Sequence, residues 1–508
     1  MQANTSFRST LAVRERYRDD YWRNNDPIAE DRLLWRAQTF RHAVHLFPGQ
    51  TILELGCGEG LFTGALLRVC RGENPITAVT FQEHVAGPPD IRAKVERLEL
   101  SDFSSSLRGR RFDCIVAMDL VDRHHASHLL KSVYELLEPG GKMVFYESNP
   151  LKPFLALRRL FLRVSGRQDP RRLLSRSQLY RMLAGSGFVD VYAVYNDFVF
   201  APLTRRLIWL LRNLSILLEN APGVQAMAGS ILVHAQKPPG EMAAPSGPRT
   251  AHESLRGAIS VVVPCYNEVT NILPLVTQLL NLYGDSVYEI ILVNDGSTDG
   301  TAAVIADLAE QDNRIKPLYR GPPNGVGHAI AEGLSRAGGR YVLTMDCDFA
   351  RLLPEFRDLF DAAVEGYDVV VGSRFSRHSV LLNYPFLKIV ANRGFHLLAR
   401  LLLLRKFRDL TNNLKLMRRE VVADLQLRQP GFAVNAETGL QPLILGYHVK
   451  EVPISWINRS PQMGASSFRL IRVSGGYWRV LLDVWLKQVF SAGPYRDLQK
   501  RPISADTE

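Results

Sequence analysis

The chain has 508 residues, of which 46% are hydrophobic and 22% charged, so we expect a folded globular protein with more than one domain. Its net charge is +11, but neither zinc-finger spacing nor an aromatic RNA-binding pattern accompanies that charge, which argues against a nucleic-acid partner. No stretch of 18 residues is free of charge, the N-terminus has no apolar signal region, and the five cysteines are scattered. We therefore expect a reduced, cytosolic chain without transmembrane helices.

The first 44 residues mix charged and apolar side chains, and we expect them to form a helical cap on the domain that follows. Residues 51–55 predict a strand, which runs into a glycine-rich turn at 56–60 and then into a helix at 61–69. Glycines at alternate positions let a ligand approach the backbone closely, and the helix offers its positive N-terminal end. Several nucleotide-binding folds share such a turn, so on its own it is weak evidence for any one ligand.

The run Ile-Leu-Glu-Leu-Gly-Cys-Gly-Glu-Gly at residues 52–60 resembles the cofactor loop of class I S-adenosylmethionine-dependent methyltransferases, and the following segments keep that family's order. The resemblance implies a Rossmann-like domain over residues 45–236 with S-adenosylmethionine as its cofactor. Asp102 matches the acid that contacts adenine, and Asp119 lies where the family lines its methyl-transfer site. The cofactor-binding residues that the resemblance implies are Glu54, Gly56, Cys57, Gly58, Gly60, Asp102 and Asp119.

The end of the second strand, at residues 76–81, departs from this family. The resemblance implies an acid there that accepts hydrogen bonds from the ribose hydroxyls, but Thr80 stands in its place. Unless Glu83 reaches the ribose, the neutral hydroxyl gives up a charge-assisted hydrogen bond of about 1–2 kcal/mol. Two hypotheses therefore remain for this half of the chain: an active methyltransferase, or a binding module that has lost methyl transfer.

Two further features of the first half allow more than one interpretation. His124, His125 and His128 precede a helix, and we interpret them as solvated side chains rather than metal ligands. Residues 152–181 carry nine basic side chains and one acid, with leucine, phenylalanine and valine interleaved. This pattern predicts an amphipathic basic helix, which either meets a membrane surface or an acceptor, or packs its apolar stripe on its own domain.

Residues 237–256 are rich in proline, glycine and alanine, and we expect a flexible linker between the two domains. A second domain over residues 257–490 begins with alternating strands and helices, and a polar tail at 491–508 follows it. Such alternation implies a parallel sheet, whose ligands bind at the carboxyl ends of the strands.

The strand expected at residues 341–345 ends in two acids, Asp346 and Asp348, separated by one residue. Alternate side chains of an extended backbone point the same way, so both carboxylates can converge on one spot. Two hard oxygen ligands suit Mg²⁺ or Mn²⁺, which keeps its other coordination positions for waters and a diphosphate. The sequence therefore predicts a divalent metal site at this edge of the sheet.

Four ordered motifs in this domain resemble family 2 glycosyltransferases of GT-A fold. They are Pro-x-Tyr-Asn-Glu at 264–268, Asp-Gly-Ser-x-Asp-Gly-Thr at 295–301, the two acids just described, and the dolichol-phosphate mannosyltransferase-like segments at 369–375, 392–395 and 409–413. The resemblance implies inverting transfer of a hexose, of the mannose or glucose type, from a GDP- or UDP-sugar to a polyprenyl or dolichyl phosphate.

The resemblance also implies roles for single residues. The nucleotide-sugar would be held by Pro264, Tyr266, Glu268, Asp295 and Asp346, and the metal by Asp346 and Asp348. Arg374 and Arg393 match arginines near the acceptor, where guanidinium groups suit a lipid phosphate that needs no general base. Glu437 falls where relatives with hydroxyl acceptors keep an acid. The implied catalytic residues are Asp346, Asp348, Arg374, Arg393 and Glu437.

The alternatives for these residues are structural. Arg374 can instead pair with Asp368, and Glu437 can cap a helix. Two departures from the family are Ala350, in place of a glutamine that supports the metal, and Asn412-Asn413, in place of a glycine pair or Gly-Ser. The donor sugar therefore stays open.

Residues 384–404 are apolar with basic flanks, and residues 473–490 are amphipathic. We interpret the first as a segment that meets the lipid, with a buried helix of the domain as the alternative. Together these features predict a bifunctional α/β enzyme at the inner face of a membrane. The rival hypothesis is transfer to a glycan or protein hydroxyl, beside a non-catalytic first domain.

Overall fold

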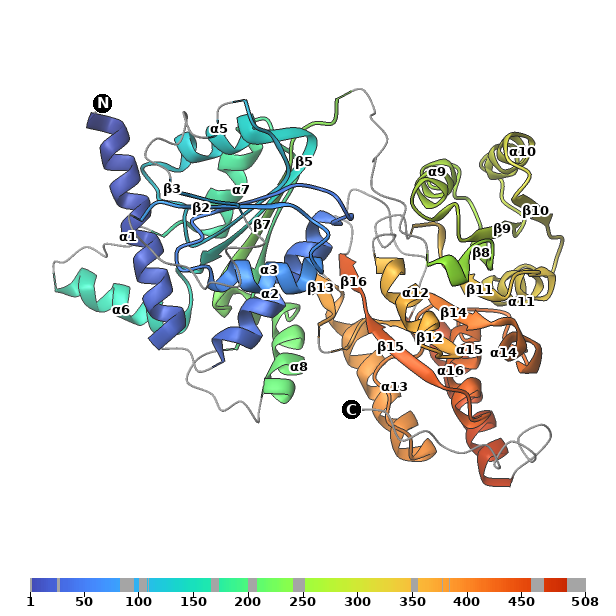
Figure 1. Cartoon of the computed structure of the whole chain (residues 1–508). Coiled ribbons are helices and arrows are strands. Elements are labelled where there is room, and N and C mark those ends of the chain that lie inside the picture. Colours follow the sequence, from blue (N-terminus) through green and yellow to red (C-terminus); the bar gives the residue numbers. More distant parts are fainter. Residues whose placement is uncertain are drawn as a thin grey trace. The chain divides into compact units, whose positions relative to one another are not determined.

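The structure of the protein, a computed structural model, describes residues 2–24, 28–82, 96–99, 107, 109–165, 173–199, 208–240, 252–348, 355–376, 378–382, 384–457 and 470–490 (Figure 1). The chain divides into two compact units. Unit 1 comprises residues 1–248 with Val380–Phe386 and Ser455–Asn458, and unit 2 comprises the remainder. No helix in the described part of the chain is long and apolar enough to cross a bilayer.

Unit 1 is built on a seven-stranded sheet of order β3-β2-β1-β4-β5-β7-β6. The five neighbouring strands β3, β2, β1, β4 and β5 pair in parallel, and β7 lies antiparallel between β5 and β6. The strands are β1 (Ile52–Leu55), β2 (Ile76–Thr80), β3 (Glu96–Glu99), β4 (Phe112–Met118), β5 (Leu137–Ser148), β6 (Val189–Asn196) and β7 (Ser230–Gln236). The helices are α1 (Gln2–Asn24), α2 (Ala29–Val44), α3 (Leu61–Cys70), α5 (Ala126–Leu136), α6 (Pro153–Val164), α7 (Arg176–Ala184) and α8 (Ile208–Glu219).

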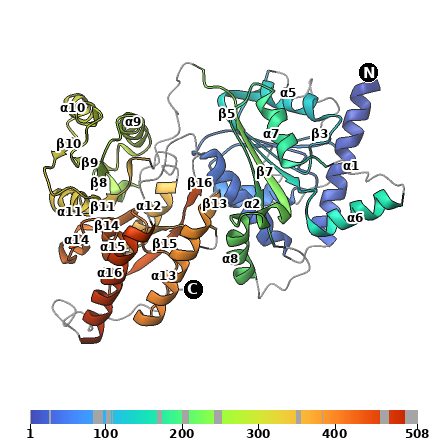
Figure 2. The ribbon, with the colours of Figure 1, turned by 180° about the vertical axis from the view of Figure 1, so that it is seen from behind.

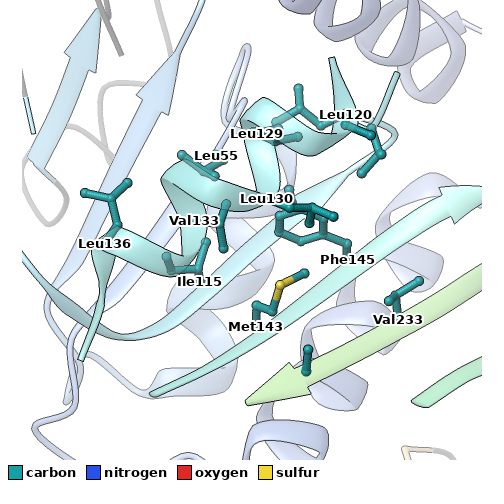
Figure 3. Packing of buried hydrophobic residues seen from close by; sticks show 14 of the residues in the cluster. Leu55, Ile115, Leu120, Leu129, Leu130, Val133, Leu136, Met143, Phe145 and Val233 are labelled. Atoms are coloured by element: carbon teal, nitrogen blue, oxygen red, sulfur yellow. The ribbon is translucent and has the colours of Figure 1, made fainter. Parts of the chain in front are cut away.

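Helix α5 shows why these sequences form these elements. Leu129, Leu130, Val133 and Leu136 recur at helical spacing, so they share one face of the helix. Figure 3 shows this face directed at the sheet, where it packs on side chains from β1, β4 and β5. A continuous apolar core results, and it fixes the carboxyl ends of the parallel strands at one edge of the sheet.

Two short strands that follow the linker in sequence also belong to unit 1. β13 (Val380–Leu382) and β16 (Ser455–Ile457) pair in parallel as a sheet of two strands. Val380 and Leu382 are buried in the same hydrophobic cluster as Phe40 and Tyr146 of unit 1. The chain therefore enters unit 1 three times, which the sequence did not indicate.

Unit 2 has a second seven-stranded sheet, of order β10-β9-β8-β11-β14-β12-β15, seen from two sides in Figures 1 and 2. β10, β9, β8 and β11 pair in parallel, and β14 is antiparallel to both β11 and β12. The strands are β8 (Ile259–Cys265), β9 (Val287–Asn294), β10 (Ile315–Tyr319), β11 (Tyr341–Thr344), β12 (Val369–Ser373), β14 (Lys415–Arg418) and β15 (Val449–Pro453). The helices are α9 (Ile272–Tyr283), α10 (Thr301–Gln311), α11 (Val326–Arg336), α12 (Phe356–Val364), α13 (Phe386–Leu403), α14 (Arg419–Asp424), α15 (Val434–Ile444) and α16 (Leu470–Phe490).

Helices α13 and α16 lie side by side in unit 2. The Phe395 ring contacts the rings of Tyr477 and Trp478, and Gln488 donates to the Leu403 carbonyl at 3.2 Å. One face of α13 is buried, while its other face exposes leucine and valine side chains. The alternative of a buried helix therefore holds for one face, whereas contact of the exposed face with lipid stays a prediction. The exposed apolar residues of the two helices are Leu387, Val390, Leu397, Leu398, Leu401, Trp478, Leu482, Leu486, Val489 and Phe490.

The basic segment after residue 152 forms α6. Among its described side chains Leu155 is buried, whereas Leu157, Leu160, Phe161 and Val164 are exposed. The interpretation that this stripe packs on its own domain is therefore wrong for these four side chains. The helix presents apolar and basic groups to solvent.

Candidate functional sites

The glycine turn of unit 1 follows β1 as predicted. Gly56, Gly58 and Gly60 all have positive φ angles, of 71°, 52° and 86°, which side chains other than glycine rarely adopt. Gly60 is the N-cap of α3. The Cys57 amide donates to the Val79 carbonyl and the Gly60 amide to the Cys57 carbonyl, so the Gly58 and Glu59 amides are left for acceptors outside the turn. The turn therefore has the backbone geometry of an anion-accepting loop.

Helix α1 lies directly against this turn. The Glu15 carboxylate accepts from the Gly58 amide at 2.5 Å and, with its other oxygen, from the Phe81 amide at 3.0 Å. The Arg18 guanidinium donates to the Gly56 carbonyl at 2.5 Å and to the Met118 carbonyl at 3.3 Å. The carboxyl ends of β1, β2 and β4 are thus all hydrogen-bonded to side chains of α1.

A third side chain of α1 completes this contact. The Asp19 carboxylate accepts from the Glu59 amide at 3.1 Å and from the Arg18 guanidinium at 2.7 Å. A methyl group built on Gly58 would overlap that carboxylate, so no free space separates the turn from α1. S-adenosylmethionine therefore does not fit against the turn while α1 holds this position.

The other residues predicted to bind the cofactor have separate partners. Glu54 is buried and accepts from the Thr63 hydroxyl at 2.7 Å, and burial raises the pKa of its carboxyl to about 7. Asp119, with a φ of 51°, accepts from the amide and hydroxyl of Ser148 at 2.8 and 2.6 Å. Cys57 is buried, and both Asp102 and Glu83 lie outside the described residues.

Glu147, at the end of β5, is a titratable group that the sequence did not single out. One of its oxygens accepts from the amides of Leu120 and Val121, both at 3.0 Å. Burial, with the nearby Asp119 charge, raises the pKa of this carboxyl to about 8. Two acids, Glu147 and Asp119, therefore lie together at the carboxyl edge of this sheet.

In unit 2, Asp346 and Asp348 follow β11 at the carboxyl edge of the sheet, as predicted. The Asn413 side-chain amide donates to Asp346 at 2.6 Å. Low exposure, and then the charge of Asp348, raise the pKa of the Asp346 carboxyl to about 7. The two carboxylates repel each other, and this repulsion is what a divalent cation would relieve.

The donor set of these two acids fits Mg²⁺ or Mn²⁺, because it consists of hard carboxylate oxygens. Within the described residues, no group of three or more His, Cys, Asp and Glu side chains could hold a metal ion. A cation held by these two acids would have further coordination positions for waters and a diphosphate.

The residues predicted to hold the nucleotide lie at the ends of β8 and β9. Pro264 is in β8, Tyr266 follows it with 58% of its surface exposed, and the Glu268 carboxylate is bonded to the Asn271 side chain. Asp295 is buried: one oxygen is paired with Arg320, and the other accepts from the Gly325 amide at 2.6 Å. The structure thus joins the Asp295 turn to the glycine-rich start of α11.

Arg374 pairs with Asp409 and not with Asp368, which was its alternative partner. Its guanidinium bonds to both oxygens of Asp409, at 2.7 and 2.9 Å, and its amide donates to the same carboxylate at 3.0 Å. Asp409 is fully buried, but the Arg374 charge keeps the pKa of this carboxyl below its usual range. Asp368 is paired with Arg418 instead, so the alternative of an Arg374–Asp368 pair is wrong.

Arg393, on α13, is close to Arg374, since both guanidinium groups lie over the Phe375 ring at 5.2 and 5.9 Å from its centroid. Among the described residues no acid pairs with Arg393 and no group hydrogen-bonds to it, whereas burial lowers the pKa of its guanidinium. A half-buried cation without a partner favours an anionic ligand.

The segment 409–415 connects these arginines to the aspartates. Thr411 accepts from Arg374 and from the Asn392 side chain, both at 3.2 Å, and Asn413 bonds to Asp346. Lys415 is fully buried and donates to the Asn412 carbonyl at 2.5 Å, and burial lowers the pKa of its ammonium to about 7. The structure thereby brings the predicted acceptor and metal residues into one bonded network.

Glu437 lies on α15, and both of its oxygens are engaged. They accept from the Arg428 amide at 3.1 and 3.0 Å, and one of them also accepts from the Gln429 amide at 3.1 Å. The N-cap of α15 is Ala433, so Glu437 fixes a neighbouring segment and does not cap its own helix. That segment in turn contacts α11, where the Gly327 amide donates to the Pro430 carbonyl at 2.8 Å.

The partners that sequence reasoning missed are Glu15, Arg18, Asp19, Arg320, Asp409, Asn413 and Lys415. Asp409 and Asn413 lie in the segment 409–413 already singled out, but no local pattern indicates the partner of any of these residues, because each meets its partner through the fold. The nearest available signal was the pair of departures from the family at Thr80 and Asn412-Asn413. Each departure lies beside one of the unexpected contacts.

Two family models match the chain. Residues 23–193 match a model described as a methyltransferase domain, and residues 260–426 match the model of glycosyl transferase family 2. The predicted order of a methyltransferase domain followed by a family 2 GT-A domain is confirmed by these matches, and the two sheets confirm the α/β class.

Two named relatives each match part of the chain. A polyprenol monophosphomannose synthase of Mycolicibacterium smegmatis is 29% identical over 230 residues, which are 43% of this chain and 86% of that protein. A dolichol-phosphate mannosyltransferase of Pyrococcus furiosus is 29% identical over 202 residues, 39% of this chain and 56% of that protein. The crystal structure of a glucosyl-3-phosphoglycerate synthase from Mycobacterium tuberculosis with Mn²⁺, UDP and phosphoglyceric acid aligns at a TM-score of 0.35, with 20% identity, over 46% of this chain and 79% of that chain.

Proposed function

Because the chain carries a methyltransferase domain followed by a family 2 glycosyltransferase domain, we propose that it is a bifunctional enzyme whose second domain transfers a hexose from a nucleotide-sugar to a polyprenyl phosphate. The observation that carries this proposal is the network of residues 409–415, in which Asp346 and Arg374 are bonded to one segment. The segment thus links a candidate metal-binding acid to an arginine that would orient the acceptor, and transfer of a sugar from a diphosphate to a phosphate would use both.

The residues divide the reaction between them. Asp346 and Asp348 would hold Mg²⁺ or Mn²⁺, which would stabilise the negative charge that develops on the leaving nucleoside diphosphate. Pro264, Tyr266, Glu268 and Asp295, at the ends of β8 and β9, would line the nucleotide, and the Asp295–Arg320 pair keeps that edge rigid.

The acceptor side uses the arginines. Arg393 has the guanidinium without a partner and would bind the lipid phosphate directly, while Arg374, fixed on Asp409, would orient the acceptor beside it. A phosphate is already ionised and attacks the sugar without a general base, and attack opposite the leaving group inverts the anomeric centre. Glu437 then has a positioning role, because both of its oxygens already accept from backbone amides.

The acceptor lipid suggests where the enzyme works. The exposed leucines of α13 and α16 lie on the same pair of helices as Arg393, so a membrane surface that covers them would present its phosphate groups to that arginine. We therefore propose peripheral attachment to the inner face of the membrane. Leu397→Gln with Leu401→Gln should weaken binding to anionic vesicles about tenfold, whereas Leu273→Gln, at an exposed leucine of α9, should not.

The test of the glycosyl transfer is a panel of GDP- and UDP-hexoses with polyprenyl phosphate and Mg²⁺ or Mn²⁺, extracted into organic solvent. Labelled lipid in the organic phase supports the proposal. Label that remains in glycan or protein would instead support the rival hypothesis of a hydroxyl acceptor. In that case Glu437→Gln should abolish turnover, whereas transfer to a phosphate should survive the substitution.

For the first domain we propose methyl transfer from S-adenosylmethionine to a product of the second domain. The match to a methyltransferase model and the fusion of the two domains support this. Incubation of the whole protein with labelled S-adenosylmethionine and the glycosylated lipid tests it, and an unlabelled lipid would count against it.

A further inference from the structure

We propose that α1 is an intramolecular competitor for the cofactor turn of unit 1, so that S-adenosylmethionine binds only when the side chains of Glu15, Arg18 and Asp19 leave the turn. This rests on the proposed methyl transfer and adds a regulatory step to it. The three side chains occupy the carboxyl ends of β1, β2 and β4 together.

The side chains that α1 places on the turn resemble the charged groups of S-adenosylmethionine. The amino-acid end of S-adenosylmethionine is a zwitterion with one carboxylate and one ammonium group. In the structure, the turn is bonded to a carboxylate, Glu15 on the Gly58 amide, and to a cation, Arg18 on the Gly56 carbonyl. Helix α1 therefore offers the turn the same pair of charged groups that the cofactor would bring.

The side chains of α1 also occupy the space beside the glycine turn. The Asp19 carboxylate lies where any atom attached to Gly58 would be, and Leu120 closes the side of Gly56, where a methyl group would lie 3.0 Å from its Cδ1. Glu15, Arg18 and Asp19 are all buried. A ligand cannot approach these two glycines without moving α1.

The end of β2, where Thr80 replaces the expected acid, also favours this position of α1. The Glu15 carboxylate lies there, on the Phe81 amide, beside the fully buried Thr80. An acid at position 80 would repel Glu15 and disfavour this contact. The neutral Thr80 is thus compatible with α1 in this position, which gives a physical reason for the departure from the family.

Helix α1 lies almost entirely before the residues that match the methyltransferase model, which begin at residue 23. The competitor is therefore an addition to the matched domain. Because α1 is joined to the domain, it acts at a high effective concentration, and cofactor binding must exceed that advantage.

The test is calorimetry of the full-length protein with S-adenosylhomocysteine, which binds without turnover. The variant combines Glu15→Gln, Arg18→Met and Asp19→Asn, because it keeps the side-chain sizes and removes the three charges of this contact together. We expect it to bind at least about tenfold more tightly than the wild type, since several charge-assisted bonds to the turn are lost. Arg16→Ala with Asp20→Asn, on the exposed face of the same helix, is the matched control and should change the affinity less than about twofold.

Hydrogen exchange of the wild-type protein gives a second readout that needs no variant. Saturating S-adenosylhomocysteine should speed exchange of the backbone amides around residues 15–22, because α1 leaves the turn. Slower exchange there would overturn the proposal, since α1 would then close over the ligand.

The outcomes separate this inference from the proposed function. If the wild type binds and the triple variant binds no more tightly, the competition is wrong while methyl transfer stands. If neither protein binds at millimolar ligand, both are wrong.

Discussion

The two sheets present polar groups at their carboxyl edges in opposite states. In unit 1, the glycine turn after β1 is bonded to Glu15 and Arg18 of the chain itself. In unit 2, Asp346 and Asp348 repel each other, and Arg393 lies over the Phe375 ring with neither an acid nor a hydrogen-bond partner among the described residues. The same kind of sequence signal thus marks one turn that the chain's own side chains occupy and one pair of acids that repel each other.

This difference teaches that a motif identifies the edge of a sheet but not whether that edge is ready for a ligand. Readiness depends on what the rest of the fold places against it. In unit 2, the partners Asp409 and Asn413 orient the site residues from the side, whereas in unit 1 the partners lie on the turn itself.

The largest effect should come from removing an acid of unit 2. Asp346→Ala should lower glycosyl transfer about 1000-fold or more, because the cation that stabilises the leaving diphosphate loses a ligand. Product formation with Mg²⁺ or Mn²⁺ measures this. Asp307→Ala, at an exposed aspartate on α10, is the control. An unchanged rate in Asp346→Ala would show that Asp346 does not hold a metal that the transfer needs.

The two arginines should separate stability from binding. Arg374→Ala leaves Asp409 buried and unpaired, so the free energy of unfolding should fall by about 3–5 kcal/mol. Arg393→Ala removes a cation without a partner, so unfolding should change by less than about 1 kcal/mol while the KM for polyprenyl phosphate rises about tenfold or more. Denaturant unfolding and acceptor titration measure both. Equal losses of stability would show that Arg393 is also structural.

A smaller effect is expected at the residue that orients Asp346. Asn413→Ala removes the amide that donates to Asp346 at 2.6 Å, and groups that orient a metal ligand typically contribute about 10- to 100-fold in affinity. The apparent affinity for Mn²⁺ in the transfer assay should fall by that factor, with the rate at saturating metal less affected. Asn313→Ala, an exposed asparagine, should leave both unchanged.

The smallest effect should be the pH dependence. The pKa of Asp346, raised to about 7 by its low exposure and by Asp348, means that metal affinity should increase as the pH rises from 6 to 8. Its pKa lies above the usual value near 4, so the metal-free protein should lose stability as the pH rises towards 7. Glu54 of unit 1 also has a pKa of about 7, so only the part of this loss that Mn²⁺ reverses belongs to Asp346.

Local patterns predicted the strands, the turns and the acids at their ends, because these depend on neighbouring residues. The strand that ends at Asp346 and the turn at Gly56–Gly60 needed no knowledge of the rest of the fold. The α/β class followed from the alternation of such elements.

The partners could not be predicted, because they come from far along the chain. Glu15 lies 43 residues from Gly58, Arg374 lies 35 from Asp409, and Asn413 lies 67 from Asp346. Arg374 is an example, because Asp368 is near it in sequence but the folded chain pairs it with Asp409. Charge alone does not choose between candidates that the fold has yet to bring together.

The short strands β13 and β16 restrict how this protein can be cut. Val380 and Leu382 fill the core of unit 1, and burial of an aliphatic side chain contributes about 1.5–3 kcal/mol. A gene fragment that stops at the linker would therefore encode a first unit with a gap in its core, a serious loss for domains stable by about 5–15 kcal/mol. The two matched domains are consecutive in the gene, yet a cut at their boundary would separate β13 and β16 from the rest of unit 1.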